Sequence, residues 1–171
     1  GDASSRAYET IGTENLVLMN APAMPDGPPI KNGKSYSEIA HLAENVSAFV
    51  AIAELLASKG FRTPNIFAQD LDAGFLTIEN LGTGSILDPQ GKPIAEQYKE
   101  AIGLLAELHQ QTFDKTISYA GGNTHVIPDY DYDAMMIEAE LLRDWYLPHE
   151  TTDHIDSEEF KEIWHDLITK A

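Results

Sequence analysis

Strand-like and helical patterns divide the chain into two parts. Before about residue 82, short apolar and β-branched runs at about 7–11, 15–19, 65–68 and 75–78 are separated by turns that contain Gly, Asp or Pro. Such runs predict short β-strands. After residue 82, apolar residues recur three and four positions apart, which predicts helices only. Because strands and helices do not alternate, the pattern indicates an α+β protein rather than a doubly wound parallel sheet.

One helix interrupts the predicted strands. It lies within residues 35–59 and ends at Gly60, a typical C-terminal cap. The preceding residues 20–36 contain several prolines and are predicted to form a surface loop, in which we interpret Lys31 and Lys34 as solvated. The three-and-four spacing gives this helix an apolar face made of Val46, Phe49, Val50, Ala53, Leu56 and Ala57.

The second half of the chain contains three predicted helices, at about 94–110, at about 133–147, and from Ser157 as N-cap onward, with an irregular stretch at 114–130. Trp145 and Tyr146 fall on a helix face, so we interpret them as core residues rather than as a surface that stacks on a sugar. The predicted inward positions are Tyr98, Ala101, Ile102, Leu105, Leu108, Met135, Ala139, Leu142, Tyr146, Phe160, Ile163, Trp164, Leu167 and Ile168.

The segment Leu76–Gly82 joins the two patterns. An apolar strand reaches the acidic residue Glu79 and stops at Gly82, which suits a hinge whose exposed backbone groups could hold a flat ring such as adenine. A plain strand end or a β-bulge would have the same sequence. The hinge interpretation predicts a nucleotide-binding lobe at 1–82, a linker at 83–94 and a partial helical lobe at 95–171.

Composition restricts the classes of function. The 171 residues carry a formal net charge of −17 with only 11 Lys and Arg, so nucleic acid and anionic membranes are not expected as partners. No cysteine is present, which excludes a disulfide framework and thiolate metal ligands, and a cytoplasmic location is the default expectation. A phosphorylated ligand would have to be held by backbone N–H groups, a metal ion or residues outside this sequence.

Several short motifs have simpler explanations. Residues 129–133 together with Glu140 match part of a calcium-loop spacing, but Ala134 stands where such a loop needs Gly, so an acidic helix start is the better interpretation. His109 falls in the last turn of a predicted helix, where it would interact favourably with the helix dipole. The six histidines include no His-Glu-x-x-His pair, and no metal site is predicted.

Seven segments, in order along the chain, resemble the kinase-like phosphotransferases related to aminoglycoside phosphotransferase and choline kinase. Within that family they are most similar to the bacterial anomeric sugar kinases that act on N-acetylmuramate and N-acetylglucosamine. The segments are Gly1–Tyr8, Leu18–Pro22, Phe49–Leu56, Arg62–Ile66, Gly74–Gly82, Leu104–His109 and Glu138–Pro148.

The resemblance implies a protein-kinase-like two-lobe fold, with an antiparallel sheet and one helix in the first lobe, a hinge, and the first helices of a second lobe. It also implies ATP and Mg²⁺ as cofactors and a sugar-like small molecule as acceptor. By resemblance, the acceptor site lies near Glu138, Glu140 and Asp144. The residues placed against the nucleotide are Gly1, Asp2, Ala3, Ser4, Ser5 and Arg6 in the phosphate loop, Met19, and Glu79, Asn80 and Leu81 in the hinge.

Three departures from the family pattern affect the expected activity. Met19 stands at the place of a phosphate-binding Lys, and Phe49 at the place of the Glu that would pair with it. No catalytic His-x-Asp-x-x-x-x-Asn is present: His154-Ile155-Asp156 matches its start, but Lys161 replaces the Asn, so we interpret it as a coincidence. The family's first strand also has no counterpart before Gly1. The catalytic base and metal ligands are therefore expected beyond Ala171, and the chain alone is predicted to be inactive.

The sequence also fits a second class of function. The Met19 departure and the low content of basic residues also fit a non-catalytic kinase-like module that binds or regulates a partner through its acidic surface.

Overall fold

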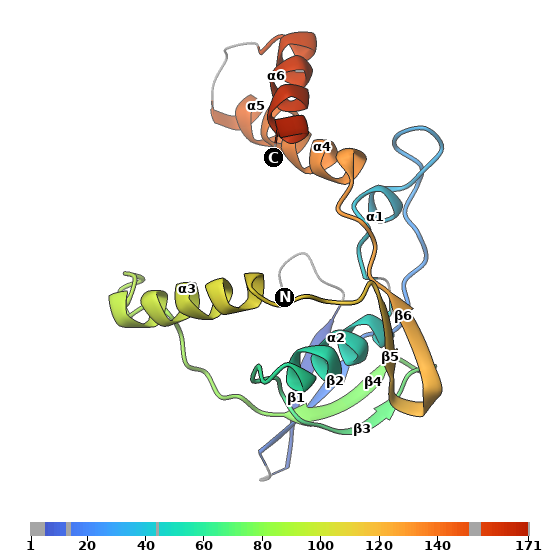
Figure 1. The fold of residues 1–171 in the computed structure, drawn as a ribbon, viewed down its shortest axis with the longest axis vertical. Helices are drawn as coiled ribbons and strands as arrows, with labels where there is room; N and C mark the ends of the chain where they lie inside the picture. The colour runs from blue at the N-terminus through green and yellow to red at the C-terminus, as the bar shows by residue number, and fades with distance from the viewer. Residues whose placement is uncertain (1–5, 13–14, 44, 151–154, 171) are drawn as a thin grey trace. The chain divides into compact units, whose positions relative to one another are not determined.

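The computed structural model describes residues 6–12, 15–43, 45–150 and 155–170. The chain forms two compact units: the first contains residues 1–22 and 47–127, and the second contains residues 23–46 and 128–171. The first is called unit 1 and the second unit 2; their helices and strands are labelled in Figure 1. The long loop predicted at 20–36 thus leads into a segment that packs with the C-terminal helices. The boundaries at 82 and 94, which were inferred for a nucleotide-binding lobe and a linker, stay a prediction.

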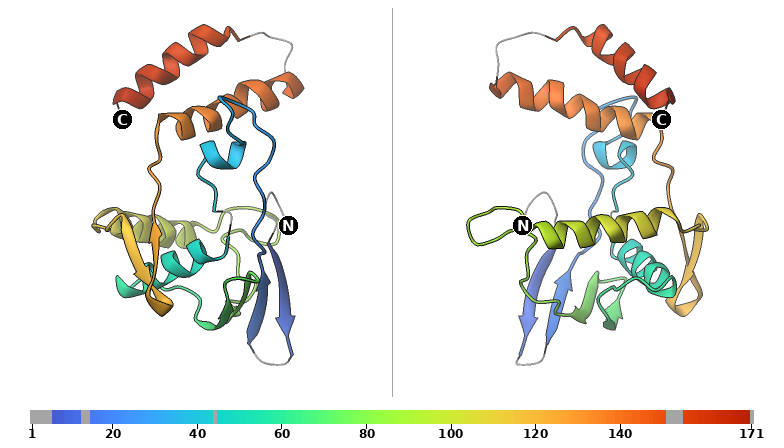
Figure 2. Two further views of the ribbon diagram at one scale, coloured as in Figure 1. Left: turned by 90° about the vertical axis from the view of Figure 1, so that its right-hand side faces the viewer. Right: turned by 60° about the vertical axis from the view of Figure 1, so that its left-hand side comes forward.

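Unit 1 is built on an antiparallel sheet of four strands in the order β1-β2-β4-β3. The strands are β1 (Ala7–Ile11), β2 (Leu16–Asn20), β3 (Ile66–Asp70) and β4 (Phe75–Glu79). Helix α2 (Ser47–Ser58) lies between this sheet and a hairpin of β5 (Thr116–Tyr119) and β6 (Asn123–Val126) (Figure 2). Unit 1 also contains α3 (Ala95–His109). The four predicted strands and the helix among them are confirmed, and so is the α+β class.

The core of unit 1 lies where the two central strands meet α2. Met19 and Leu76 are opposite each other in the β2–β4 pair, and both are fully buried. On α2, Val50 and Ala53 are buried as predicted, and Ala51 is buried as well. Burial of these side chains from both the sheet and the helix supplies the main stabilisation of the unit.

The prediction of an irregular stretch at 114–130 is wrong for its middle part. Residues 116–126 form the β5–β6 hairpin, which turns through the 3-10 turn η1 (Ala120–Gly122). Gly121 and Gly122 both have positive φ, which fits their place in a tight turn. Burial alternates along β5, where Ile117 is buried and Tyr119 is half-buried, but the strand has only four residues and so gives a short pattern. Glu54 of α2 accepts a hydrogen bond from the Ala120 N–H at 3.0 Å, which fixes the turn against the helix.

Unit 2 consists of short helices around one long helical segment. That segment runs through α4 (Tyr132–Leu141), the π-helical turn η2 (Leu142–Tyr146) and α5 (Leu147–Glu150). Helix α4 lies between α1 (Tyr36–Ile39) and α6 (Ser157–Lys170) (Figure 2). Ile39, Ala40 and Ile137 form a small buried cluster, against which Tyr36 packs.

Carboxylates begin two helices of unit 2. Asp131 accepts the Ala134 N–H at 3.0 Å and is the N-cap of α4, which confirms the interpretation of residues 129–133 as an acidic helix start. Asp156 accepts the N–H groups of Glu158 and Glu159, so the cap of α6 is Asp156 and the prediction of Ser157 is wrong by one residue. Asp156 therefore has a structural role, as expected for a coincidental catalytic motif.

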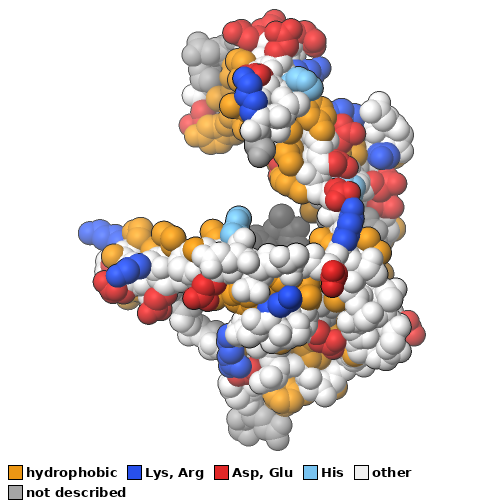
Figure 3. Space-filling view, in the orientation of Figure 1, with side chains coloured by type: hydrophobic (Ala, Val, Ile, Leu, Met, Phe, Trp, Pro, Cys, Tyr) orange, Lys and Arg blue, Asp and Glu red, His pale blue; other side chains and the backbone are white. Residues whose placement is uncertain are grey.

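The predicted inward faces of the later helices are largely exposed. On α3, no residue is buried, and Tyr98, Ile102 and Leu105 are exposed. Figure 3 shows hydrophobic side chains on the surface of this helix. On α4, the buried residues are Ala134, Met136 and Ile137 instead of the predicted positions. The π-helical turn shifts the helix register by one residue, because the Leu147 N–H bonds the Leu142 carbonyl rather than the next one along. Tyr146 and Trp145 consequently lie on the surface, so their assignment to the core is wrong.

No helix in the described ranges is long and apolar enough to cross a membrane.

Gly74, in the turn between β3 and β4, provides a test of the sheet. Its φ is +77°, and an added Cβ would lie 2.5 Å from the Ala21 carbonyl oxygen. Because this oxygen belongs to the backbone, it cannot move away as a flexible side chain could. We expect Gly74→Ala to lower the free energy of unfolding by at least about 2 kcal/mol, since the left-handed conformation alone costs roughly 1–2 kcal/mol. The measurement is urea unfolding followed by circular dichroism.

Gly84→Ala is the matched control for this substitution. Gly84 has no positive φ and nothing lies within 4 Å of an added Cβ, so the free energy of unfolding should change by less than about 0.5 kcal/mol. Equal stability of both variants would contradict the close approach of the two backbones at Gly74.

Candidate functional site

The side chain of the predicted hinge residue Glu79 is held by three donors. Arg62 Nη2 donates to one carboxylate oxygen, and the backbone N–H and side-chain amide of Asn65 donate to the other at 3.2 and 2.9 Å. The hydrogen bond from Arg62, followed by that from the Asn65 backbone, holds the pKa of Glu79 below its usual value. The carboxylate is thereby fixed toward the β3 side of the hinge.

In the predicted hinge, residues 79–81, two of the three backbone N–H groups donate to other described residues. The Glu79 N–H donates to the Asn65 carbonyl at 2.9 Å, and the Asn80 N–H donates to the Asn15 carbonyl at 3.0 Å. The Asn80 side chain in turn accepts the Gly82 N–H at 2.9 Å. Within the described part of the chain, the Leu81 N–H has no hydrogen-bond partner, and Leu81 is exposed. This amide is the one backbone donor of the predicted hinge that no described residue engages.

The other residues predicted at the nucleotide are less accessible or not described. Gly1, Asp2, Ala3, Ser4 and Ser5 lie outside the described residues, and Arg6 is half-buried just before β1. Met19 is 0% exposed, so its side chain belongs to the core and offers no surface to a phosphate. Its contact with a nucleotide remains a prediction that this structure does not support.

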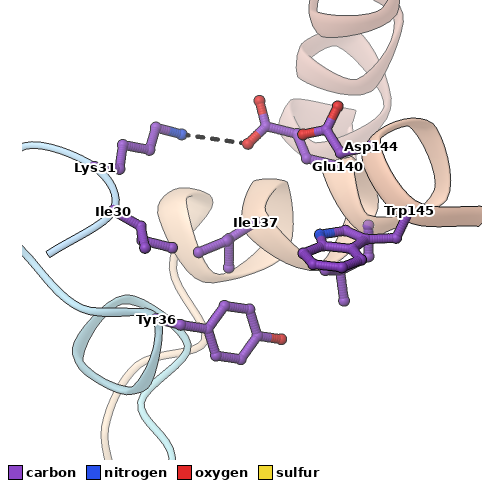
Figure 4. A pocket seen from close by; sticks show the side chains of 8 residues that line it. Ile30, Lys31, Tyr36, Ile137, Glu140, Asp144 and Trp145 are labelled. Atoms are coloured by element: carbon purple, nitrogen blue, oxygen red, sulfur yellow. Dashed lines mark ion pairs between the residues drawn. The ribbon is translucent and has the colours of Figure 1, made fainter. Parts of the chain in front are cut away.

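Unit 2 contains a pocket with a volume of about 590 Å³. Glu140 and Asp144, two of the three predicted acceptor residues, line it on the same side as Lys31, and apolar side chains line the other side (Figure 4). Glu138 does not line the pocket. Its carboxylate accepts a hydrogen bond from the hydroxyl of Tyr36, and Tyr36 does line the pocket. The lining residues are Ile30, Lys31, Tyr36, Ile137, Glu140, Leu141, Asp144 and Trp145.

Charge pairing organises the polar side of the pocket. Lys31 Nζ lies 3.6 Å from Glu140 Oε2 (Figure 4). Arg143 donates from Nε and Nη2 to the two oxygens of Asp144, and its Nη2 lies 3.8 Å from Glu140 Oε1. The hydrogen bond from Arg143 keeps the pKa of Asp144 below its usual value, so this carboxylate is ionised at neutral pH.

Two local features place Lys31 and Trp145 at the pocket. Lys31 and Lys34 form an antiparallel bridge around Asn32-Gly33, which both have positive φ and make a tight hairpin turn. The π-helical turn brings Trp145 to the surface, where it is 69% exposed. Sequence reasoning missed both roles, although the Asn-Gly pair is a strong hairpin signal that indicates a fixed rather than a freely solvated Lys31.

The described residues contain no group of three or more His, Asp or Glu side chains that could hold a metal ion. His109 is exposed at the end of α3, and His41 bonds Asp131 at 3.1 Å, so this histidine joins α1 to α4. His154 lies outside the described residues.

The model of the phosphotransferase enzyme family matches residues 1–170. The chain belongs to the phosphotransferase enzyme family. The chain is also similar to three curated relatives named N-acetylmuramate/N-acetylglucosamine kinase. The relative from Caulobacter vibrioides is 32% identical over 158 residues, which cover 85% of this chain and 43% of the relative. The relative from Pseudomonas putida is 35% identical over 153 residues, which cover 87% of this chain and 37% of the relative.

A third relative of the same name, from Pseudomonas aeruginosa, is 33% identical over 149 residues, covering 85% of this chain and 36% of that protein. This phosphotransferase-family chain therefore spans about two fifths of the length of the curated relatives that it matches. No solved structure matches it significantly. The resemblance inferred from the seven segments is confirmed at the level of the family.

Tyr36 provides a test of the contacts at the pocket. Burial, together with the hydrogen bond to Glu138 and its charge, raises the pKa of Tyr36 to about 12 from 10.0. The neutral phenol is therefore the form that the fold favours. Its contribution to stability is complete below pH 10 and is lost as the pH rises toward 12. We expect Glu138→Gln to lower this pKa part of the way to 10, because burial remains.

The measurement is the difference in tyrosinate absorbance between the unaltered protein and Tyr36→Phe during a pH titration, repeated in the Glu138→Gln background. An unchanged Tyr36 titration in the Glu138 variant would contradict the hydrogen bond.

Proposed function

We propose that this chain provides the nucleotide hinge and the acceptor pocket of an ATP-dependent kinase that phosphorylates an amino sugar. The observation that carries this proposal is the pocket of unit 2, in which Glu140 and Asp144 meet an exposed Trp145. Its volume of about 590 Å³ falls in the range of small-molecule sites, roughly 300–1,000 Å³.

The chemistry of the pocket suits a hydroxylated ring. The carboxylates of Glu140 and Asp144 are hydrogen-bond acceptors, and a sugar presents hydroxyl donors. The ring of Trp145, exposed beside them, offers apolar surface to the C–H face of a sugar. The relatives named as N-acetylmuramate/N-acetylglucosamine kinases support amino sugars as the acceptor class.

The hinge suits a purine. The Leu81 N–H, which has no partner among the described residues, is a donor for a ring nitrogen. The hydrogen bonds from Arg62 and Asn65 to Glu79 hold the hinge in one conformation. Mg²⁺, when bound with ATP, would neutralise phosphate charge and orient the transferred group. The described residues show no cluster that fits the metal, so none of them is assigned to it or to the catalytic base.

A non-catalytic kinase-like binding module is the second candidate. It is favoured by the full burial of Met19 at the place of the family's phosphate-binding Lys. Phosphorylation of an amino sugar by the native gene product would exclude it; nucleotide and sugar binding without turnover would favour it.

The acceptor pocket is tested with Trp145→Ala. We expect this substitution to reduce kcat/KM for N-acetylglucosamine by about 5- to 30-fold through the loss of about 1–2 kcal/mol of ring contact. Tyr146→Ala is the matched control, because Tyr146 is the exposed neighbour that does not line the pocket. A coupled assay of ADP release by the native gene product measures both variants. Equal loss in both would argue against the pocket as the acceptor site.

The hinge is tested with Leu81→Pro, which removes the N–H. We expect the thermal stabilisation by ATP to disappear in this variant and to persist in Leu81→Ala, which keeps the N–H and loses the same side chain. Melting curves without nucleotide report whether both variants fold. Full stabilisation of Leu81→Pro by ATP would remove the hinge donor from the proposal.

A further inference from the structure

Lys31 is the one cationic side chain among the eight residues that line the pocket of unit 2. Its backbone is fixed by the Asn32-Gly33 turn, in which the Lys34 N–H donates to the Lys31 carbonyl at 2.9 Å. The side chain extends along the polar side of the pocket toward Glu140 (Figure 4). A lysine held in this way is directed into the pocket rather than into open solvent.

The ion pair of Lys31 with Glu140 is loose. At 3.6 Å it is longer than a strong charge-assisted hydrogen bond, about 2.7–2.9 Å, and the Lys31 side chain is still 39% exposed. Lys31 can therefore turn to another anion with little loss.

The carboxylates of the pocket do not depend on Lys31 alone. Arg143 binds both oxygens of Asp144, and it also lies 3.8 Å from Glu140, whose side chain is 15% exposed. If Lys31 moved to a ligand, Asp144 would keep both hydrogen bonds from Arg143, and Glu140 would keep Arg143 as a cation 3.8 Å away.

We propose that Lys31 binds the carboxylate of an acidic amino sugar, so that the pocket distinguishes sugars with a carboxylate substituent from neutral ones. This inference rests on the proposed function. N-acetylmuramate carries a lactyl carboxylate, whereas N-acetylglucosamine carries none. Glu140 and Asp144 would repel that carboxylate, and Lys31 supplies the compensating charge at the pocket edge.

The experiment compares both sugars with the native gene product and its Lys31→Met variant. The substitution keeps most of the side-chain length and removes the charge. Equilibrium binding of each sugar is measured by calorimetry, and kcat/KM is measured where turnover occurs. We expect Lys31→Met to weaken the binding of N-acetylmuramate by about 10- to 100-fold relative to the binding of N-acetylglucosamine. This is the effect of losing one hydrogen bond to a charged group.

Two further variants define the effect. Lys34→Met removes the neighbouring exposed lysine, which does not line the pocket, and should leave the ratio between the sugars unchanged. Lys31→Arg keeps the charge and should restore most of the ratio. Higher ionic strength should reduce the preference of the unaltered protein for N-acetylmuramate and should not affect Lys31→Met.

The outcomes separate this inference from the proposed function. A selective loss of N-acetylmuramate binding in Lys31→Met supports it even where the protein transfers no phosphate. An equal effect on both sugars, or the same ratio in all variants, overturns the role of Lys31 while phosphorylation of either sugar still supports the kinase. A native protein that binds neither sugar overturns both.

Discussion

Three carboxylates on or beside α4 each receive a side chain from the segment 31–41, and unit 2 depends on these contacts. His41 bonds Asp131, the Tyr36 hydroxyl donates to Glu138, and Lys31 pairs with Glu140. The apolar cluster between these elements is small, consisting of Ile39, Ala40 and Ile137 with Tyr36 at its edge. Isolated surface ion pairs contribute only about 0–1 kcal/mol each, but contacts at three successive points also fix the register of one element against the other. In a chain with a net charge of −17, acidic partners are abundant and basic ones scarce, so the few donors determine where the segment docks.

The same principle operates in unit 1 at Glu79, in the predicted hinge. Glu79 ends β4 with its carboxylate bound to Arg62 and Asn65, two residues that precede β3. The side chain is thus directed to one side of the strand, and the hinge backbone continues past it to Leu81. The Glu79 carboxylate is engaged in structure, whereas among the described residues the Leu81 N–H has no partner. The expectation that Glu79–Leu81 hold a ligand through backbone groups stays a prediction.

Local patterns were sufficient for the sheet and for α2, because strand runs and turn residues act over a few positions. They failed in the β5–β6 hairpin, because each strand has only four residues and the alternation of β5 is too short to distinguish it from a loop. They also failed for the faces of α3 and α6, since periodicity shows that a helix has an apolar side but not that a partner covers it. Of the residues that line the pocket, Glu140 and Asp144 were expected near an acceptor site. Lys31 was not, because its contact with Glu140 joins positions more than a hundred residues apart and leaves no local signal.

The π-helical turn at 142–146 links the irregularity of unit 2 to its pocket. A regular helix through these residues would keep one register from Tyr132 to Glu150 and would turn Trp145 to a different direction. The wider turn gives up regular hydrogen bonding, and it leaves the large aromatic surface of Trp145 in water, which is unfavourable in the absence of a ligand. Asp144 lies in the same turn and is held by Arg143, so the turn presents an ionised acceptor and an apolar ring side by side. The irregular turn and the exposed indole both lower the stability of the free protein. A bound ring with hydroxyl groups would cover the indole and donate hydrogen bonds to Asp144, and so would offset both losses.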